Sequence, residues 1–206
     1  MSLLTFFVAA VVLAVTPGPG LAYVIARTVS GGRGEGLASC FGTGFGGMVH
    51  VLAAALGLSL LIAQSALAFS LVKYIGAAYL IYLGIRMLMR RDAVDQPSTD
   101  VKPQGPKRAL LEGVVVEILN VKTALFFLAF LPQFVSSTAP LIPQLVTLGS
   151  ICVALNTLVD VFAVLAAHRL LRSGVARAAR ARVLRRISGV TMIGLGTFLA
   201  FARQRT

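Results

Sequence analysis

Hydrophobic residues run in six long segments along the chain, and charged or turn-forming residues separate these segments. The segments cover roughly residues 3–26, 37–62, 66–88, 110–135, 141–167 and 184–202. Each is close to the roughly 20 residues that an α-helix needs to cross the hydrocarbon core of a bilayer. The pattern predicts an all-α integral membrane protein, with six transmembrane helices that form a single domain over residues 1–206.

Composition agrees with a lipid-embedded chain. Hydrophobic residues make up 57% of the sequence and charged residues 13%, whereas soluble domains carry about 25% charged residues. The net charge is +12, but the basic residues lie between apolar segments rather than on a folded basic domain. We therefore interpret them as topology signals and expect no binding to nucleic acid.

The connections between segments differ in charge. Residues 63–65 and 136–140 carry no charge, whereas the other three connections are rich in Lys and Arg. By the positive-inside rule these three are cytoplasmic, which places both termini outside. The basic run 170–186 is either an amphipathic helix on anionic lipid headgroups or a solvated loop.

A linker, residues 89–109, divides the chain into two halves, residues 3–88 and 110–202. Because each half has three segments, the halves have opposite orientations in the membrane. Related halves would therefore form an inverted repeat. Four apolar or glycine positions match between the ends of the two halves: Ile75 with Ile187, Ile81 with Ile193, Leu83 with Leu195 and Gly84 with Gly196.

The first segment is interrupted by Thr16, Pro17, Gly18, Pro19 and Gly20. Proline removes a backbone donor and glycine lowers helix propensity. Broken backbone at membrane depth is tolerated only against protein or around a wet cavity. The free N–H groups that follow the break would bind an anion such as a substrate carboxylate. A kink packed against a neighbouring helix is the alternative.

The fourth segment is interrupted by polar residues. Glu117, Asn120 and Lys122 lie within about one and a half helical turns. A buried charge is costly unless it is paired or hydrated. We predict substrate contacts for Asn120 and Lys122, and a proton-coupling role for Glu117. The alternative is a hydrogen-bonded brace, with Lys122 extending toward the interface.

Asn156 and Asp160 in the fifth segment are four residues apart and share one helical face. A buried carboxyl group can exchange a proton between the two sides of a membrane. We therefore predict that Asp160 couples transport to protons and that Asn156 contacts substrate. A static ion pair of Asp160 with Lys122 or Lys73 is the alternative.

The second segment places His50 after a glycine-rich stretch. Gly42 and Gly46 have the spacing that marks close helix approach. A packed, hydrogen-bonded His50 is favoured over a proton relay. Cys40 and Cys152 are expected to be small packed hydrophobes. We expect neither a metal site nor a cofactor.

The motifs, in this order and spacing, resemble the lysine exporter (LysE/RhtB, homoserine–threonine exporter) family of bacterial amino-acid efflux proteins. They are the Thr16–Pro19 break, the glycine-rich second segment, Lys73–Gly84, Asn120–Lys122 with Leu125–Phe127, Leu131–Phe134 and Ser188–Gly196. The resemblance implies a transporter, not an enzyme, in the bacterial inner membrane. It also implies export of amino acids or related metabolites by proton antiport, as a homo-oligomer.

Val121 departs from this family, whose usual sequence here is Asn-Pro-Lys. Because valine keeps the backbone donor, we expect a less sharply broken fourth helix. Among the deep charges, Lys73 and Lys122 balance Glu117 and Asp160. This balance favours a zwitterionic substrate with a neutral side chain over lysine or arginine.

Two other functions compete with amino-acid export. A thiol–disulfide electron carrier would use Cys40 and Cys152, but both lie far from the breaks and lack a charged activator. A metal-ion exporter is disfavoured because the only histidines are His50 and His168.

Overall fold

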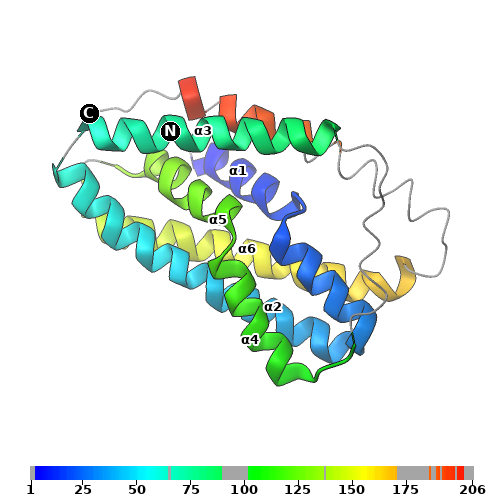
Figure 1. Ribbon diagram of the computed structural model, residues 1–206. Coiled ribbons are helices and arrows are strands. Elements are labelled where there is room, and N and C mark those ends of the chain that lie inside the picture. The colour runs from blue at the N-terminus through cyan, green and yellow to red at the C-terminus, as the bar shows by residue number, and fades with distance from the viewer. Residues whose placement is uncertain are drawn as a thin grey trace.

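The computed structural model describes residues 3–64, 66–89, 102–136 and 138–170, together with 186, 189–190, 192–197 and 199–201. All regular secondary structure in these residues is helical, and Figure 1 shows the arrangement of the helices. They are α1 (Leu3–Val15), α2 (Pro19–Gln64), α3 (Ala66–Met89), α4 (Pro106–Ile118), α5 (Val121–Leu125), the π-helix η1 (Phe126–Phe130), the 3₁₀-helix η2 (Leu131–Phe134) and α6 (Leu141–Leu170).

The first predicted segment is broken where the Pro-Gly cluster lies. Helix α1 ends at Val15, and the hydroxyl of Thr16 donates to the carbonyl of Val12 at 2.6 Å. Helix α2 begins at Pro19, and its first turn closes with a 3.0 Å bond from the Ala22 N–H to the Gly18 carbonyl. Pro19 therefore starts a new helix, as expected for a residue whose missing N–H is not needed there.

Helix α2 reverses direction at Gly32, whose φ of 74° and ψ of −169° are open to glycine alone. Figure 1 shows its two parts running back alongside each other. Across this hairpin, Val24 packs in one buried cluster with Leu37 and Cys40. The hairpin therefore separates the first predicted segment from the second.

Several described helices are suited to a membrane. By length and composition, Pro19–Gly57, which includes the reversal at Gly32, and Leu141–Ala166 are long and apolar enough to cross a bilayer. Pro106–Ile118 and Val121–Phe134 pass the same test as a pair, bent by 47°. Residues 90–101 and 171–185, which hold much of the predicted linker and basic run, lie outside the described residues, as does part of the sixth segment.

Small residues let neighbouring helices pack closely. A Cβ atom on Gly46 would lie 2.7 Å from the Val114 carbonyl of α4, and Gly42 faces Gly113 on the same helix. The predicted close helix approach of Gly42 and Gly46 is therefore confirmed, with α4 as the partner.

The contact between α3 and the C-terminal residues is reciprocal. A Cβ atom on Gly84 would lie 2.7 Å from Cγ1 of Ile193, and one on Gly196 would lie 2.7 Å from Cγ1 of Ile81. Gly84 and Ile81 are the positions that match Gly196 and Ile193 in the sequence comparison of the two halves. The glycine of each half therefore packs against the isoleucine of the other half, and the two contacts involve equivalent positions.

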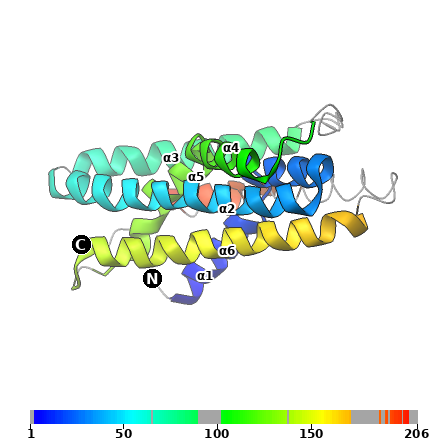
Figure 2. The same ribbon diagram turned by 90° about the horizontal axis from the view of Figure 1, so that it is seen from below.

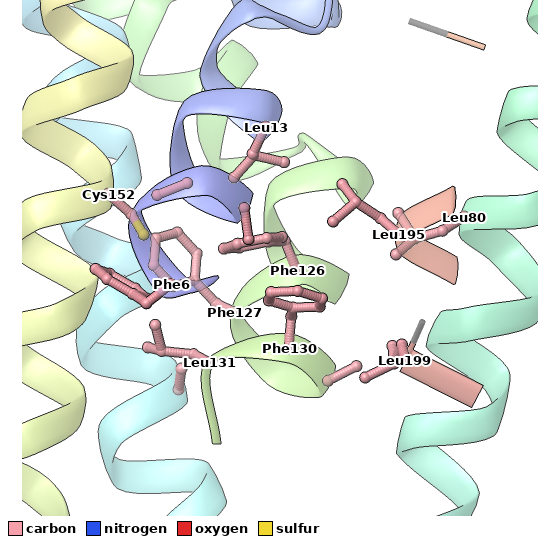
Figure 3. Close-up of a cluster of buried hydrophobic side chains, with 14 of the residues drawn as sticks. Phe6, Leu13, Leu80, Phe126, Phe127, Phe130, Leu131, Cys152, Leu195 and Leu199 are labelled. Atoms are coloured by element: carbon pink, nitrogen blue, oxygen red, sulfur yellow. The ribbon is translucent and has the colours of Figure 1, made fainter. Parts of the chain in front are cut away.

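An aromatic core is built largely from η1 and η2, which follow the break between α4 and α5. Phe126 stacks on Phe130 with ring centroids 4.9 Å apart, and Phe6 of α1 meets Phe134 edge-on at 5.4 Å. Figure 3 shows this cluster, with Cys152 of α6 at its side. Cys152 is a free, buried thiol, which agrees with the prediction of a packed hydrophobe.

Candidate functional site

A polar pocket is lined by residues of both helix breaks and of α6. Figures 1 and 2 show α6 running alongside α2. The cavity volume of the pocket is about 30 Å³, room for about two water molecules. It brings together eight predicted site residues: Thr16, Gly18, Gly20, Glu117, Asn120, Lys122, Asn156 and Asp160. Pro17 and Pro19 belong to the first break but do not line the pocket.

Lys122 joins the two breaks. Its Nζ donates to the carbonyl oxygens of Thr16 at 2.9 Å and Leu13 at 3.3 Å. Leu13 lies in the last turn of α1 and Thr16 follows it, where carbonyls have few backbone partners and the helix dipole favours a positive charge. The buried Lys122 ammonium therefore completes the end of α1 instead of extending toward the membrane interface.

Glu117 lies against the start of α2. Its carboxylate accepts hydrogen bonds from the Thr123 hydroxyl at 2.6 Å and the Asn120 amide at 3.0 Å. A Cβ atom on Gly20 would lie only 2.5 Å from Glu117 Oε2, so glycine makes room for this carboxylate. The helix N-terminus that the sequence predicted to hold a substrate carboxylate thus already faces a carboxylate of the protein.

Asn120 interrupts the fourth segment although Val121 replaces the usual proline. Its side-chain oxygen accepts from the Lys122 N–H at 3.2 Å and caps α5. The backbone N–H of Asn120 donates to the Glu117 carbonyl at 2.9 Å. The fourth segment is therefore broken at Asn120 and bent by 47° with valine at position 121, because the asparagine caps the new helix. That this break is less sharp than one with the usual Asn-Pro-Lys stays a prediction.

Asp160 reaches the pocket from α6. It accepts a 3.1 Å hydrogen bond from the Thr43 hydroxyl, which also lies 3.0 Å from the Cys40 carbonyl. A single hydroxyl proton serves both acceptors. Asn156 lines the pocket one turn away and is half-buried.

The charges in the pocket do not balance. Lys122 is the basic residue among the lining residues, and Glu117 and Asp160 are the acidic ones. Lys73 does not line the pocket, and its ammonium lies 5.2 Å from the ring centroid of Tyr74. The sequence-based count of two positive and two negative charges therefore does not describe this pocket, which holds one excess carboxylate when all three groups are ionised.

His50 supports the second break from outside the pocket lining. Its Nε2 lies 2.7 Å from the Glu117 carbonyl, and because a carbonyl only accepts, this nitrogen carries a proton. The favoured interpretation of a hydrogen-bonded histidine is confirmed. Within the described part of the chain, no three His, Cys, Asp or Glu side chains are grouped to hold a metal.

Sequence reasoning missed three threonines. Thr43 and Thr123 donate to the pocket carboxylates, and Thr157 lines the pocket beside Gly44. Thr43, a hydroxyl inside the glycine-rich stretch, offered the clearest signal. Thr123 comes six residues after its partner across a helix break, so no helical spacing pointed to it.

Comparison with known proteins identifies relatives. Residues 11–203 match the model of a family described as LysE type translocator. An uncharacterized membrane protein of Vibrio cholerae is 35% identical over 76% of each chain. The uncharacterized membrane protein YrhP of Bacillus subtilis is 30% identical over 95% of this chain and 96% of its own. A homoserine/homoserine lactone efflux protein of Salmonella typhimurium is 29% identical over 75% and 74%. No solved structure matches.

Proposed function

The chain belongs to the family of LysE type translocators, and on that premise we propose that it exports amino acids or closely related small metabolites from bacteria in exchange for protons. Family members are membrane transporters rather than enzymes, and a small molecule is their substrate. The observation that carries the proposal is the meeting of two broken helices at one charged pocket. Discontinuous helices form the substrate sites of many secondary transporters.

We propose a single domain of six spans in the inner membrane, built as two inverted repeats with both termini outside and associated as a homo-oligomer among membrane lipids. The reciprocal contacts of Gly84 with Ile193 and Gly196 with Ile81 support the repeat. A two-fold axis between α3 and the C-terminal residues would produce such an exchange of equivalent positions.

The proposed substrate is a small amino acid with a neutral side chain. Its carboxylate would bind the remaining N–H of Lys122, because two of the three ammonium donors are used by Thr16 and Leu13. Its ammonium group would bind Asp160, and Asn156 would contact its other polar atoms. The Salmonella relative is named for homoserine and its lactone, neither of which has a charged side chain.

The proposed proton site is Asp160. Two donors hold Glu117, whereas Asp160 shares the single hydroxyl proton of Thr43. Hydrogen bonds stabilise the charged form of a carboxyl group. Asp160 therefore has fewer hydrogen-bond donors than Glu117, and it lies one helical turn from Asn156 on α6. Glu117 is the second candidate for this role.

A thiol–disulfide carrier is less well supported. Cys40 is 0% and Cys152 2% exposed, and they belong to different buried clusters. Exchange chemistry needs accessible thiolates that can reach a partner sulfur.

Counterflow in proteoliposomes tests the proposed transport without assuming an energy source. Labelled homoserine and threonine should accumulate inside proteoliposomes that hold the unlabelled compound. A pH gradient that is acidic outside should drive their uphill export. Protein-free liposomes give the background. Counterflow of lysine alone, or export that ignores the pH gradient, would contradict the proposed substrate or the proposed coupling respectively.

A further inference from the structure

A second group of buried charges lies outside the pocket, where the hairpin turn of α2 meets the residues that lead into α4. We call residues 102–105 the strap. Arg27 and Glu35 flank the turn at Gly32, and both are buried, with 9% and 3% exposure. Figure 1 shows the start of α4 close to the turn of α2.

Glu35 fastens the strap to α2. One carboxylate oxygen, Oε1, accepts from the N–H groups of Gln104 and Gly105, each at 2.7 Å. No side chain of this segment caps α4, which begins at Pro106. A carboxylate at a helix N-terminus is stabilised by the helix dipole and the free donors. Glu35 therefore caps α4 from a different part of the chain.

Arg27 adds a second set of contacts. Its Nη1 donates to the Lys102 carbonyl at 3.3 Å and lies 3.6 Å from Glu35 Oε2. Its Nη2 lies 3.9 Å from Glu112 of α4. Tyr23, one turn before Arg27, donates to the Ala109 carbonyl at 2.9 Å. These contacts tie the first part of α2 to both the strap and α4.

The same two helices lead to the pocket. The first part of α2 begins beside Gly20, which lines the pocket, and continues to Tyr23 and Arg27. Helix α4 carries Glu112 near the strap and Glu117 at the pocket. The first part of α2 and α4 thus both extend from the strap to the pocket, and a movement that separates them must break the strap contacts.

The network is incompletely satisfied. Arg27 Nε and Glu35 Oε2 are buried and have no hydrogen-bond partner. Buried ion pairs offset their desolvation only when their hydrogen bonds are complete. Because these two atoms lack partners, the arrangement in the structure gains little free energy from the ion pair itself. Separating Arg27 from Glu35 therefore costs correspondingly little free energy.

We propose that Arg27, Glu35 and the strap form a gate that closes the pocket at the end predicted to be cytoplasmic. Substrate enters an exporter from the cytoplasm, so this gate opens for loading and closes before release on the other side. The inference goes beyond the proposed substrate and coupling ion, since a gate at this end would serve any cargo of the pocket.

The test measures access to the pocket with a cysteine reporter. Thr157→Cys, in a background with Cys40→Ala and Cys152→Ala, lines the pocket. Glu35→Gln should raise its labelling rate by a membrane-impermeant thiol reagent in inside-out vesicles by about tenfold, because charge-assisted hydrogen bonds are weakened. Labelling from the opposite side should not rise.

A disulfide lock separates gating from misfolding. A Cβ atom on Gly34 would lie 4.0 Å from Pro106 Cγ, so these two neighbouring positions are the pair to test as a lock, with Gly34→Cys and Pro106→Cys. Oxidation of this pair in the Glu35→Gln variant should return labelling of the reporter to the slow rate. A misfolded variant would remain labelled whether or not the lock is oxidised, and that result would overturn the proposal.

Arg108→Gln is the matched control. Arg108 binds Glu112 at 3.0 Å but is 70% exposed and does not contact Glu35. Its removal should leave reporter labelling unchanged. Equal labelling of Glu35→Gln and the unsubstituted reporter protein, or an equal increase in Arg108→Gln, would also overturn the gate.

Discussion

The Lys122 ammonium lies 2.9 Å from the carbonyl oxygen of Thr16 and so joins two breaks that are 106 residues apart. Through this bond, the end of α1 depends on a side chain of the second half. A ligand that draws Lys122 into the pocket would therefore weaken its hold on α1. The contact provides a direct physical connection between substrate binding and the position of a helix.

Replacement of Lys122 by methionine should weaken substrate binding by at least about tenfold, since hydrogen bonds to charged groups contribute about 1.5–3 kcal/mol. Methionine keeps much of the side-chain volume but removes the donors. Binding is measured as the half-saturating concentration in counterflow. Lys73→Met, a buried lysine outside the pocket, is the control. An equal loss in both variants would count against a substrate contact for Lys122.

Gly20→Ala should abolish transport while the protein still inserts in the membrane. The new Cβ atom would lie 2.5 Å from Glu117 Oε2, so the carboxylate must leave the start of α2. Gly57→Ala is the matched control, because a Cβ atom there meets nothing within 4 Å. Both variants are compared by counterflow at equal protein levels. Normal transport by Gly20→Ala would show that the Glu117 position is not required.

Asp160→Asn should separate exchange from coupling. Asparagine keeps the size of the side chain and can still accept from Thr43, but it does not titrate in this pH range. Counterflow should survive at a higher half-saturating substrate concentration, because the substrate ammonium loses its charged partner, whereas uphill export driven by a pH gradient should stop. Retained coupling would exclude Asp160 as the proton site, and Glu117→Gln would then be the next variant to measure.

Val121→Pro should be tolerated, with thermal stability and counterflow close to those of the unsubstituted protein. Val121 is the first residue of α5, a position where proline costs little. Val115→Pro, inside α4, is the contrasting variant and should cost about 3 kcal/mol or more in stability. Similar losses of thermal stability in the two variants would contradict the break that Asn120 caps.

The proposed orientation is tested with single cysteines. Labels at Asp100 and Val175 should react from the cytoplasm, and labels at Gln64 and Thr138 should react from outside, because the basic connections remain inside. The measurement uses a membrane-impermeant reagent on right-side-out and inside-out vesicles. The reverse pattern would place the strap gate on the outer face.

The positions of both helix breaks could be predicted from local chemistry. The Pro-Gly cluster ends α1 at Val15 and starts α2 at Pro19, because the lost donor and the low helix propensity act on the residues themselves. The break at Asn120 also follows from local chemistry, because the asparagine side chain caps α5.

The gathering of polar residues was also foreseeable. Eight of the predicted residues line one pocket, because polar groups within a membrane protein turn away from lipid. The free-energy cost of exposing a polar group to lipid depends on its depth in the membrane and on the helix face that it occupies. The spacing of polar residues along the sequence indicates both.

The choice of partners was decided by the tertiary structure alone. Lys122 bonds to carbonyls of α1 instead of Asp160, Glu117 occupies the start of α2, and Lys73 stays outside the pocket. Glu35 caps a helix that begins about 70 residues later in the chain. Periodicity shows which face of a helix is polar but not which other helix meets that face. Each pairing depends on packing between distant segments, and small residues such as Gly20 and Gly46 set how closely those segments approach.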